Sequence, residues 1–277
     1  MKPKRALVVG MGGFRGAYDS AVATELHANL SPNYFDTIYA CSSGTFTASY
    51  FAADVPEIGE RIWREHSYGK KIFNYRNFQN KRNILDLESL IDIFKIGDTR
   101  LPLENITPES ARLVYVATNV LTGNAEYFDI NQENIFDLMT ASSAIPILHP
   151  PVQINGDNYL DGGLSDPLPF RRAIEEGHDE ILIIYNKEPG FLVDKYFKYS
   201  KHLIAKSLNK SLRSGILNLE SKYQQIEDDF RLDSRIKVIR PNIKFPLKIL
   251  LDTNKERINL AADLGHKDAR RFLQDNF

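Results

Sequence analysis

The sequence has a single cysteine, no long hydrophobic run and no excess of one charge. Because Cys41 is the one cysteine among 277 residues, no internal disulfide can form and nothing requires an oxidising compartment. The apolar run Ala6–Val9 has four residues, whereas a signal-peptide core needs roughly 7–15 and a membrane-spanning helix about 18. We therefore expect a cytoplasmic protein without signal peptide or transmembrane segment, which at most contacts a membrane peripherally.

The remaining composition is that of an ordinary globular protein. Hydrophobic residues make up 43% and charged residues 26% of the chain. These proportions exclude disordered, collagen-like and repeat-dominated classes. A chain of this length supports one large α/β domain without disulfide or metal staples.

The net charge of −1 conceals an uneven distribution. Residues 187–277 carry 19 Lys and Arg against 12 Asp and Glu, so the preceding part of the chain is acidic. Residues 195–213 contain six basic residues and no acidic one. No nucleic-acid-binding motif accompanies this basic stretch, so we do not expect nucleic acid as a partner.

The N-terminal pattern predicts alternating strands and helices. A buried strand at 5–9 leads through glycines into a helix at 15–30, and a second strand at 35–40 leads into a helix at 43–53. This order is typical of a parallel sheet with helices on its faces. The predicted fold class is α/β, a three-layer α/β/α sandwich with a mostly parallel central sheet.

Further elements are expected along the chain. Strands are predicted at 113–117, 180–185 and 235–239, a hairpin at 152–160 with Asn155-Gly156 in its turn, and a closing helix at 257–273. The stretch 67–110 is polar and irregular, with Tyr68, Phe73, Tyr75 and Phe78 among polar residues. It forms either a lid over a site or an ordinary surface excursion.

A serine turn lies between the second strand and its helix. In the pattern G-x-S-x-G the central residue is Ser42, the last is Gly44, and Ala40 replaces the first glycine. A nucleophilic serine is best presented on a sharp turn with small neighbours, where the following helix points its amides at the site. The alternative interpretation is that the serine only caps the helix.

A glycine loop, Gly10–Gly16, connects the first strand to the first helix. It is no dinucleotide fingerprint, because Arg15 stands where G-x-G-x-x-G requires glycine, and no P-loop, because Gly-Lys-Ser/Thr is absent. Successive amides in such a turn can bind an oxyanion, with a nearby arginine adding positive charge. The alternative is a tight turn without a ligand.

An Asp-Gly-Gly turn begins at Asp161. A serine nucleophile needs a base, usually histidine. His178 resembles a surface residue at a helix end, and His149 in Leu-His-Pro-Pro is the hardest to dismiss. Because no histidine occupies a persuasive loop, we favour a direct pair in which Asp161 deprotonates Ser42; a Ser-His-Asp hydrolase using His149 or His178 is the alternative.

Together these segments resemble the bacterial patatin-like phospholipases over about residues 5–186, with 187–277 as a C-terminal extension of a single domain. The family's glycine loop matches Met11–Gly16, its serine elbow Ala40–Gly44 and its Asp-Gly-Gly motif Asp161–Gly163. Two further segments, Ala141–Pro151 and Ala117–Gly123, resemble the family's sequence before the aspartate and its middle strand. Each motif alone is weak evidence for the resemblance, but five motifs in the family's order are specific.

The resemblance implies a lipid acyl hydrolase with a Ser42–Asp161 dyad and neither metal nor organic cofactor. It implies phospholipids or other acyl lipids as substrates. The oxyanion and substrate loop it implies consists of Gly12, Gly13, Phe14, Arg15 and Gly16. Met11 and Ala40 depart from the family's glycines, so a catalytically silent scaffold that binds lipid or protein is the second alternative.

The basic stretch continues into an apolar stripe. Basic residues from Lys195 to Arg213 and apolar residues from Phe197 to Leu219 both recur at helical spacing, which predicts an amphipathic helix. Such a helix either packs on the sheet with a solvated basic face or lies on a membrane surface. The oligomeric state is left open by the sequence.

Overall fold

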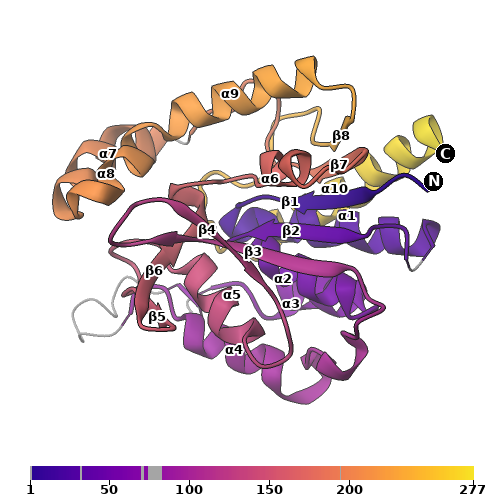
Figure 1. The fold of residues 1–277 in the computed structure, drawn as a ribbon, viewed down its shortest axis with the longest axis horizontal. Helices are drawn as coiled ribbons and strands as arrows, with labels where there is room; N and C mark the ends of the chain where they lie inside the picture. Colours follow the sequence, from indigo (N-terminus) through magenta and orange to yellow (C-terminus); the bar gives the residue numbers. More distant parts are fainter. Residues whose placement is uncertain (1, 32, 70–71, 74–82, 194) are drawn as a thin grey trace.

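The computed structural model describes residues 2–31, 33–69, 72–73, 83–193 and 195–277. Helices surround one central sheet (Figure 1). The strands are β1 (Arg5–Val9), β2 (Thr37–Cys41), β3 (Arg112–Asn119), β4 (Ala125–Asp129), β5 (Val152–Ile154), β6 (Asp157–Asp161), β7 (Glu180–Ile184) and β8 (Ile236–Ile239). The α-helices are α1 (Gly16–Asn29), α2 (Gly44–Ala52), α3 (Pro56–Glu65), α4 (Leu87–Lys95), α5 (Ile135–Ser143), α6 (Phe170–Glu175), α7 (Lys195–Ser207), α8 (Lys210–Leu217), α9 (Leu219–Leu232) and α10 (Lys255–Asn276).

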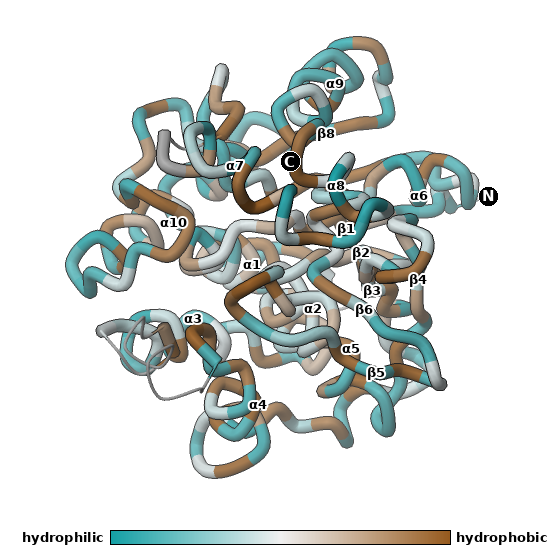
Figure 2. Tube along the Cα trace, turned by 90° about the vertical axis from the view of Figure 1, so that its left-hand side faces the viewer, coloured by the Kyte–Doolittle hydropathy of each residue, from teal (hydrophilic) through white to brown (hydrophobic). Residues whose placement is uncertain are grey.

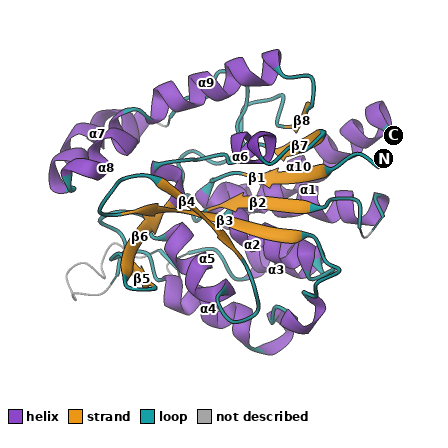
Figure 3. Cartoon of the chain, viewed as in Figure 1, coloured by secondary structure: helices purple, strands orange, loops and turns teal. Residues whose placement is uncertain are grey.

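The sheet is mixed, with a parallel centre. Its order is β5-β6-β3-β2-β1-β7-β8, and β4 pairs with β3. Strands β3, β2, β1, β7 and β8 are parallel, whereas β4, β6 and β5 join by antiparallel pairs. Figure 3 shows helices on both faces of this sheet, so the predicted three-layer α/β/α fold is confirmed.

Alternating side chains of the central strands feed two separate cores. Leu7 and Val9 of β1 belong to the larger core with α1, α2 and α10, while Ala6 and Val8 face the smaller core with α6 and α9. This period of two is what a strand buried on both faces requires. Helix α10 alternates between hydrophobic and hydrophilic segments (Figure 2), as expected of a helix with one buried face.

Strands β2 and β6 converge on one edge of β3. Cys41, the last residue of β2, pairs with Val116, and Asp161, the last residue of β6, pairs with Ala117. Strand β4 pairs with both Val116 and Ala117 and therefore occupies the other edge. The ends of β2 and β6 thus meet head-on, and the residue after Cys41 is brought next to Asp161.

Residues 67–110 are more regular than the sequence indicated. Helix α4 lies within this stretch and buries Leu87, Leu90, Ile91 and Phe94. The Asp86 side chain caps the helix by accepting from the Ser89 N–H. Tyr75 and Phe78 lie outside the described residues. Strand β4 and helix α5 were not predicted. Their short apolar runs show neither the alternation of a strand nor the spacing of a helix clearly.

The predicted amphipathic helix over 195–219 is wrong in its continuity. The chain forms α7, α8 and the start of α9, with breaks at Leu208–Asn209 and at Asn218. Phe197, Ile204 and Ile216 line a pocket, and all three also pack against the larger core. Figure 1 shows α7 and α8 at one end of the molecule, away from most of the sheet.

Other predicted elements agree with the structure. The hairpin is β5–β6, with positive φ angles of 51° at Asn155 and 93° at Gly156, and the closing helix is α10. Across the described ranges, no helix is both long and apolar enough to cross a membrane.

Candidate active site

Ser42 occupies a strained turn between β2 and α2. Its φ of 55° is unusual for a residue with a side chain. The Ser42 N–H donates to Ser142 Oγ at 2.9 Å, and Ser142 Oγ donates to the Val116 carbonyl at 2.7 Å. A Cβ on Gly44 would come within 2.5 Å of the Val9 carbonyl oxygen, so the turn requires glycine there. These contacts fix the Ser42 hydroxyl at the amino end of α2.

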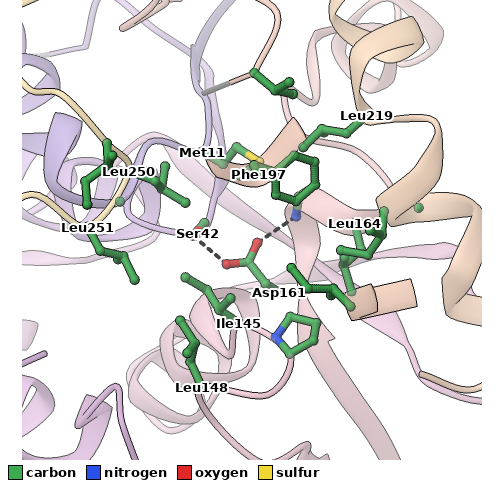
Figure 4. Close-up of a pocket in the computed structure, with 18 of the residues that line it drawn as sticks. Met11, Ser42, Ile145, Leu148, Asp161, Leu164, Phe197, Leu219, Leu250 and Leu251 are labelled. Carbon is green, nitrogen blue, oxygen red and sulfur yellow. Dashed lines mark hydrogen bonds between the residues drawn. The ribbon is translucent and has the colours of Figure 1, made fainter. Parts of the chain in front are cut away.

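The Ser42 hydroxyl and the Asp161 carboxylate form a direct pair. Ser42 Oγ donates to Asp161 Oδ2 at 2.7 Å, and the other carboxylate oxygen accepts from the Gly163 N–H at 2.8 Å (Figure 4). Both residues are buried, with exposures of 4% and 3%. Burial raises the pKa of Asp161 to about 6, against the opposing effects of the Gly163 and Ser42 hydrogen bonds.

Two amides of the glycine loop make no hydrogen bond within the described structure. Met11 N–H donates to Pro167 and Phe14 N–H to Leu250, whereas the N–H groups of Gly12 and Gly13 have no acceptor among the described residues. Gly13 has a φ of 54°, and a Cβ there would lie 2.6 Å from the Leu250 carbonyl oxygen. The loop conformation therefore depends on glycine at this position.

A buried polar cluster holds this loop from below. Lys187 Nζ donates to the Met11 carbonyl at 2.8 Å and to Asn186 Oδ1 at 3.1 Å. Asn186 Nδ2 donates to Asp19 Oδ2 at 2.7 Å and lies so close to Gly12 that a Cβ there would be 2.2 Å away. Burial lowers the pKa of Lys187 and raises that of Asp19, and each opposes the shift of the other.

The sequence did not indicate this cluster as part of a site. A signal was nevertheless present, because Asn186-Lys187 follows the apolar strand β7 after a single intervening residue, Tyr185. Polar residues at the carboxyl end of a central parallel strand lie at the edge where α/β proteins bind ligands.

The other residues of the glycine loop have different environments. Arg15 Nη1 donates to the Asn186 carbonyl and pairs with Glu188, and its guanidinium lies 4.4 Å from the ring centres of both Phe191 and Phe245. Arg15 nevertheless lines the pocket that contains Ser42 and Asp161. Of the predicted loop residues, Gly12, Phe14 and Gly16 do not line that pocket. Gly12 is buried against Asn186, Phe14 packs edge-on against Trp63, and a Cβ on Gly16 would collide with Trp63.

Neither candidate histidine is paired with the serine. His149 Nδ1 lies 2.7 Å from the Pro150 carbonyl and its Nε2 lies 3.2 Å from Glu88. His178 was expected at the surface but is buried against Tyr39, with Nδ1 2.9 Å from the Ala173 carbonyl. Burial lowers the pKa of His178. Both rings thus have other partners than Ser42 and Asp161.

An apolar cavity of about 400 Å³ opens over the dyad. Ser42 and Asp161 lie at its base, and Met11 contributes a side chain beside Asp161 (Figure 4). Three further segments build the walls: Ile145–Leu148 after α5, Ile249–Leu251 before α10, and the inner faces of α7, α8 and α9. The cavity is suited to a hydrophobic chain whose polar end reaches Ser42.

Comparison with known proteins supports the fold and the family. A model of the patatin-like phospholipase family matches residues 7–174. The uncharacterised protein YjjU of Escherichia coli (strain K12) is 26% identical over 230 residues, which cover 80% of this chain and 63% of that protein. This chain therefore matches less than two thirds of the length of that relative.

A solved structure shares the architecture. The crystal structure of VipD from Legionella pneumophila has a TM-score of 0.55 and 12% sequence identity, and the match covers 99% of this chain and 67% of VipD. At this identity the similarity establishes the fold alone.

The family match includes each loop that meets at the cavity. Residues 7–174 contain the glycine loop, the serine turn and the Asp161 turn, which the structure brings together at the carboxyl ends of β1, β2 and β6. The match spans more than half of the 277 residues. The chain belongs to the patatin-like phospholipase family.

Proposed function

We propose that this protein hydrolyses carboxylic esters of lipids through a Ser42–Asp161 dyad and an acyl-enzyme. The observation that carries the proposal is the 2.7 Å hydrogen bond from Ser42 Oγ to a buried carboxylate at the base of an apolar cavity. Membership in the patatin-like phospholipase family supports lipid hydrolysis at this site. The residues present supply a nucleophile and a base, so the proposed reaction uses neither metal nor organic cofactor.

The first step acylates Ser42. Ser42 Oγ attacks the ester carbonyl carbon while its proton moves to Asp161 Oδ2, and the carbonyl oxygen becomes an oxyanion. The free N–H groups of Gly12 and Gly13 are the proposed donors to that oxygen. When the tetrahedral intermediate collapses, the ester bond breaks and the alcohol leaves with the proton from Asp161.

The second step releases the acid. A water molecule attacks the acyl carbon while Asp161 accepts its proton, and collapse of the second intermediate returns that proton to Ser42 Oγ. Asp161 therefore alternates between base and acid, which requires a pKa near the working pH. Its raised pKa of about 6 meets that requirement.

One observation favours the second candidate, a scaffold that binds lipid without turnover. Met11 stands where the family has glycine, and a Cβ on Gly163 would lie 2.2 Å from Met11 Sδ. The methionine thus packs against the Asp161 turn and narrows the cavity beside the dyad. A silent scaffold and a hydrolase differ in whether Ser42 is nucleophilic.

Fluorophosphonate labelling distinguishes these two functions. We expect the purified protein to be labelled on Ser42, because the probe reacts with activated serines, and the labelled peptide is identified by mass spectrometry. Asp161→Asn should lose the label and Ser43→Ala should keep it. Absence of label on the folded wild-type protein would contradict the hydrolase and favour the scaffold.

Histidine variants test the alternative catalytic machinery in the same assay. His149→Ala and His178→Ala should both be labelled at a rate within about threefold of wild type, since neither ring contacts the dyad. Circular dichroism checks that each variant is folded. Loss of labelling in either folded variant would show that histidine acts as the base.

The pH dependence of turnover reports on Asp161. The carboxylate must be ionised to accept the serine proton, so kcat/KM should fall about tenfold per pH unit below pH 6 and reach a plateau above it. The measurement is kcat/KM for a water-soluble ester between pH 4.5 and 8.5. A rate that stays within about twofold of its plateau down to pH 4.5, as the ordinary pKa of about 4 for aspartate would give, would contradict the proposed role of burial.

A further inference from the structure

Helix α7 has two faces with different surroundings. Phe197, Ser200 and Ile204 line the cavity above the dyad. Tyr199 and Leu203, one turn apart, point outward with exposures of 77% and 75%. The same helix thus forms a wall of the cavity and presents large apolar side chains to solvent.

The outward side chains are surrounded by positive charge. Lys198, His202, Lys206, Lys210 and Arg213 are all exposed and recur at helical spacing along α7 and α8. Lys201, on the inner side, pairs with Glu220, and Lys198 lies 4.0 Å from the same carboxylate. Within the described part of the chain, Lys206, Lys210 and Arg213 have no acidic partner.

A neighbouring turn adds another exposed apolar side chain. The turn between β3 and β4 is held against α8 by a hydrogen bond of 2.8 Å from Ser211 Oγ to the Val120 carbonyl. Leu121 in this turn is 82% exposed. Ile147, which lines the cavity, is also 53% exposed.

We propose that Tyr199 and Leu203, with the basic residues of α7 and α8 around them, form a docking surface for an anionic lipid bilayer. The charge favours this occupant, because residues 195–213 hold six basic residues and no acidic one while the chain as a whole has a net charge of −1. Tyrosine and leucine enter the headgroup region, and lysine and arginine attract anionic headgroups. The position also fits, since the inner face of the docked helix lines the cavity that receives the acyl chain.

This inference rests on the proposed function for its choice of a bilayer, but binding can be tested without turnover. The probes are vesicles of diether phosphatidylcholine alone and vesicles with about 30% diether phosphatidylserine. Diether lipids lack the carboxylic ester, so hydrolysis cannot alter them. We expect the wild-type protein to co-sediment at least tenfold more strongly with the anionic vesicles, and this preference to decrease as salt is raised from 50 to 500 mM.

Paired variants separate the apolar and the charged contributions. Tyr199→Ser with Leu203→Ser should weaken binding to anionic vesicles at least tenfold, and Lys206→Glu with Lys210→Glu should remove the preference for anionic lipid. The matched control is Leu232→Ser with Lys237→Glu, since Leu232 is 82% exposed at the far end of α9. This control should bind as wild type does.

Turnover of a water-soluble short-chain ester keeps the two proposals apart. The docking variants should hydrolyse it at the wild-type rate, because none of their side chains touches the dyad. Binding without any turnover would overturn the hydrolase and leave the docking surface intact. Turnover with no vesicle binding, or binding that neither variant pair reduces, would overturn the docking surface.

Discussion

Replacement of Asp161 by asparagine will abolish ester hydrolysis and stabilise the folded protein. Activity should fall at least about 10³-fold, because asparagine cannot accept the Ser42 proton. The geometry should persist, since the amide oxygen can accept from the Gly163 N–H and the amide nitrogen can donate to Ser42 Oγ. The variant therefore removes one proton acceptor and little else.

The stability change follows from the raised pKa of Asp161. The folded protein binds this proton with a pKa of about 6 and the unfolded chain with an ordinary value of 3.8, so ionisation of the buried group disfavours folding above pH 6. At pH 8 Asp161→Asn should raise the free energy of unfolding by about 1–3 kcal/mol. The gain should shrink as the pH falls through 6 toward 4, where the wild-type group is protonated in the folded state.

Urea unfolding at pH 8 and at pH 4.5, together with initial rates on a soluble ester, measures both effects. Ser42→Ala should lose activity to the same extent, whereas Ser43→Ala should retain it because the Ser43 hydroxyl has no hydrogen-bond partner in the described structure. An active Asp161→Asn protein would refute the dyad. An inactive variant that is less stable than wild type at pH 8 would refute the claim that the buried charge of Asp161 destabilises the folded protein.

Gly12→Ala is expected to produce the second largest loss of activity. A Cβ would approach Asn186 Nδ2 to 2.2 Å, and Asn186 cannot withdraw easily because it is buried and bonded to Asp19 and Lys187. The loop must move instead, and the Gly12 and Gly13 amides would leave the proposed oxyanion position. Loss of such donors costs about 10²–10³ in kcat.

The measurement is kcat and KM for the same soluble ester. The loss should fall mainly on kcat, because the donors act on charge that develops in the transition state. Gly177→Ala is the matched control: Gly177 lies in an exposed turn after α6 with nothing within 4 Å of an added Cβ. It should lower stability by about 1 kcal/mol without changing kcat. Unchanged kcat in Gly12→Ala would remove this loop from the mechanism.

The sequence predicted the parts of the site that depend on local chemistry. The serine turn, the glycine loop and the Asn155-Gly156 hairpin each need small residues or positive φ angles, and these requirements are visible in the residues themselves. The central strands were also recognisable, since strands buried on both faces are continuously apolar. The structure then placed Ser42 and Asp161 in direct contact.

The parts that depend on tertiary contacts were not predicted. The roles of Asn186 and Lys187 come from the loop that packs over them, and a buried lysine looks like any surface lysine in a sequence. The apolar stripe of residues 197–219 packs against the two cores as expected, but the sequence did not show that part of it also lines a cavity. A hydrophobic pattern shows that a face is covered without showing what covers it.

The head-on meeting of β2 and β6 has a consequence for when the proposed dyad forms during folding. Ser42 and Asp161 are 119 residues apart in sequence. They meet through the pairing of the β5–β6 hairpin with β3 and through the end of α5, where Ser142 accepts from the Ser42 N–H and the Ala144 carbonyl accepts from the Asp161 N–H. Contacts of such large sequence separation close late in folding, because the loop entropy must first be offset. A nascent chain that has completed β1, β2 and β3 therefore has Ser42 without the carboxylate that pairs with it. Under the proposed mechanism Ser42 becomes reactive when the hairpin docks, so a partly folded chain should not attack lipids.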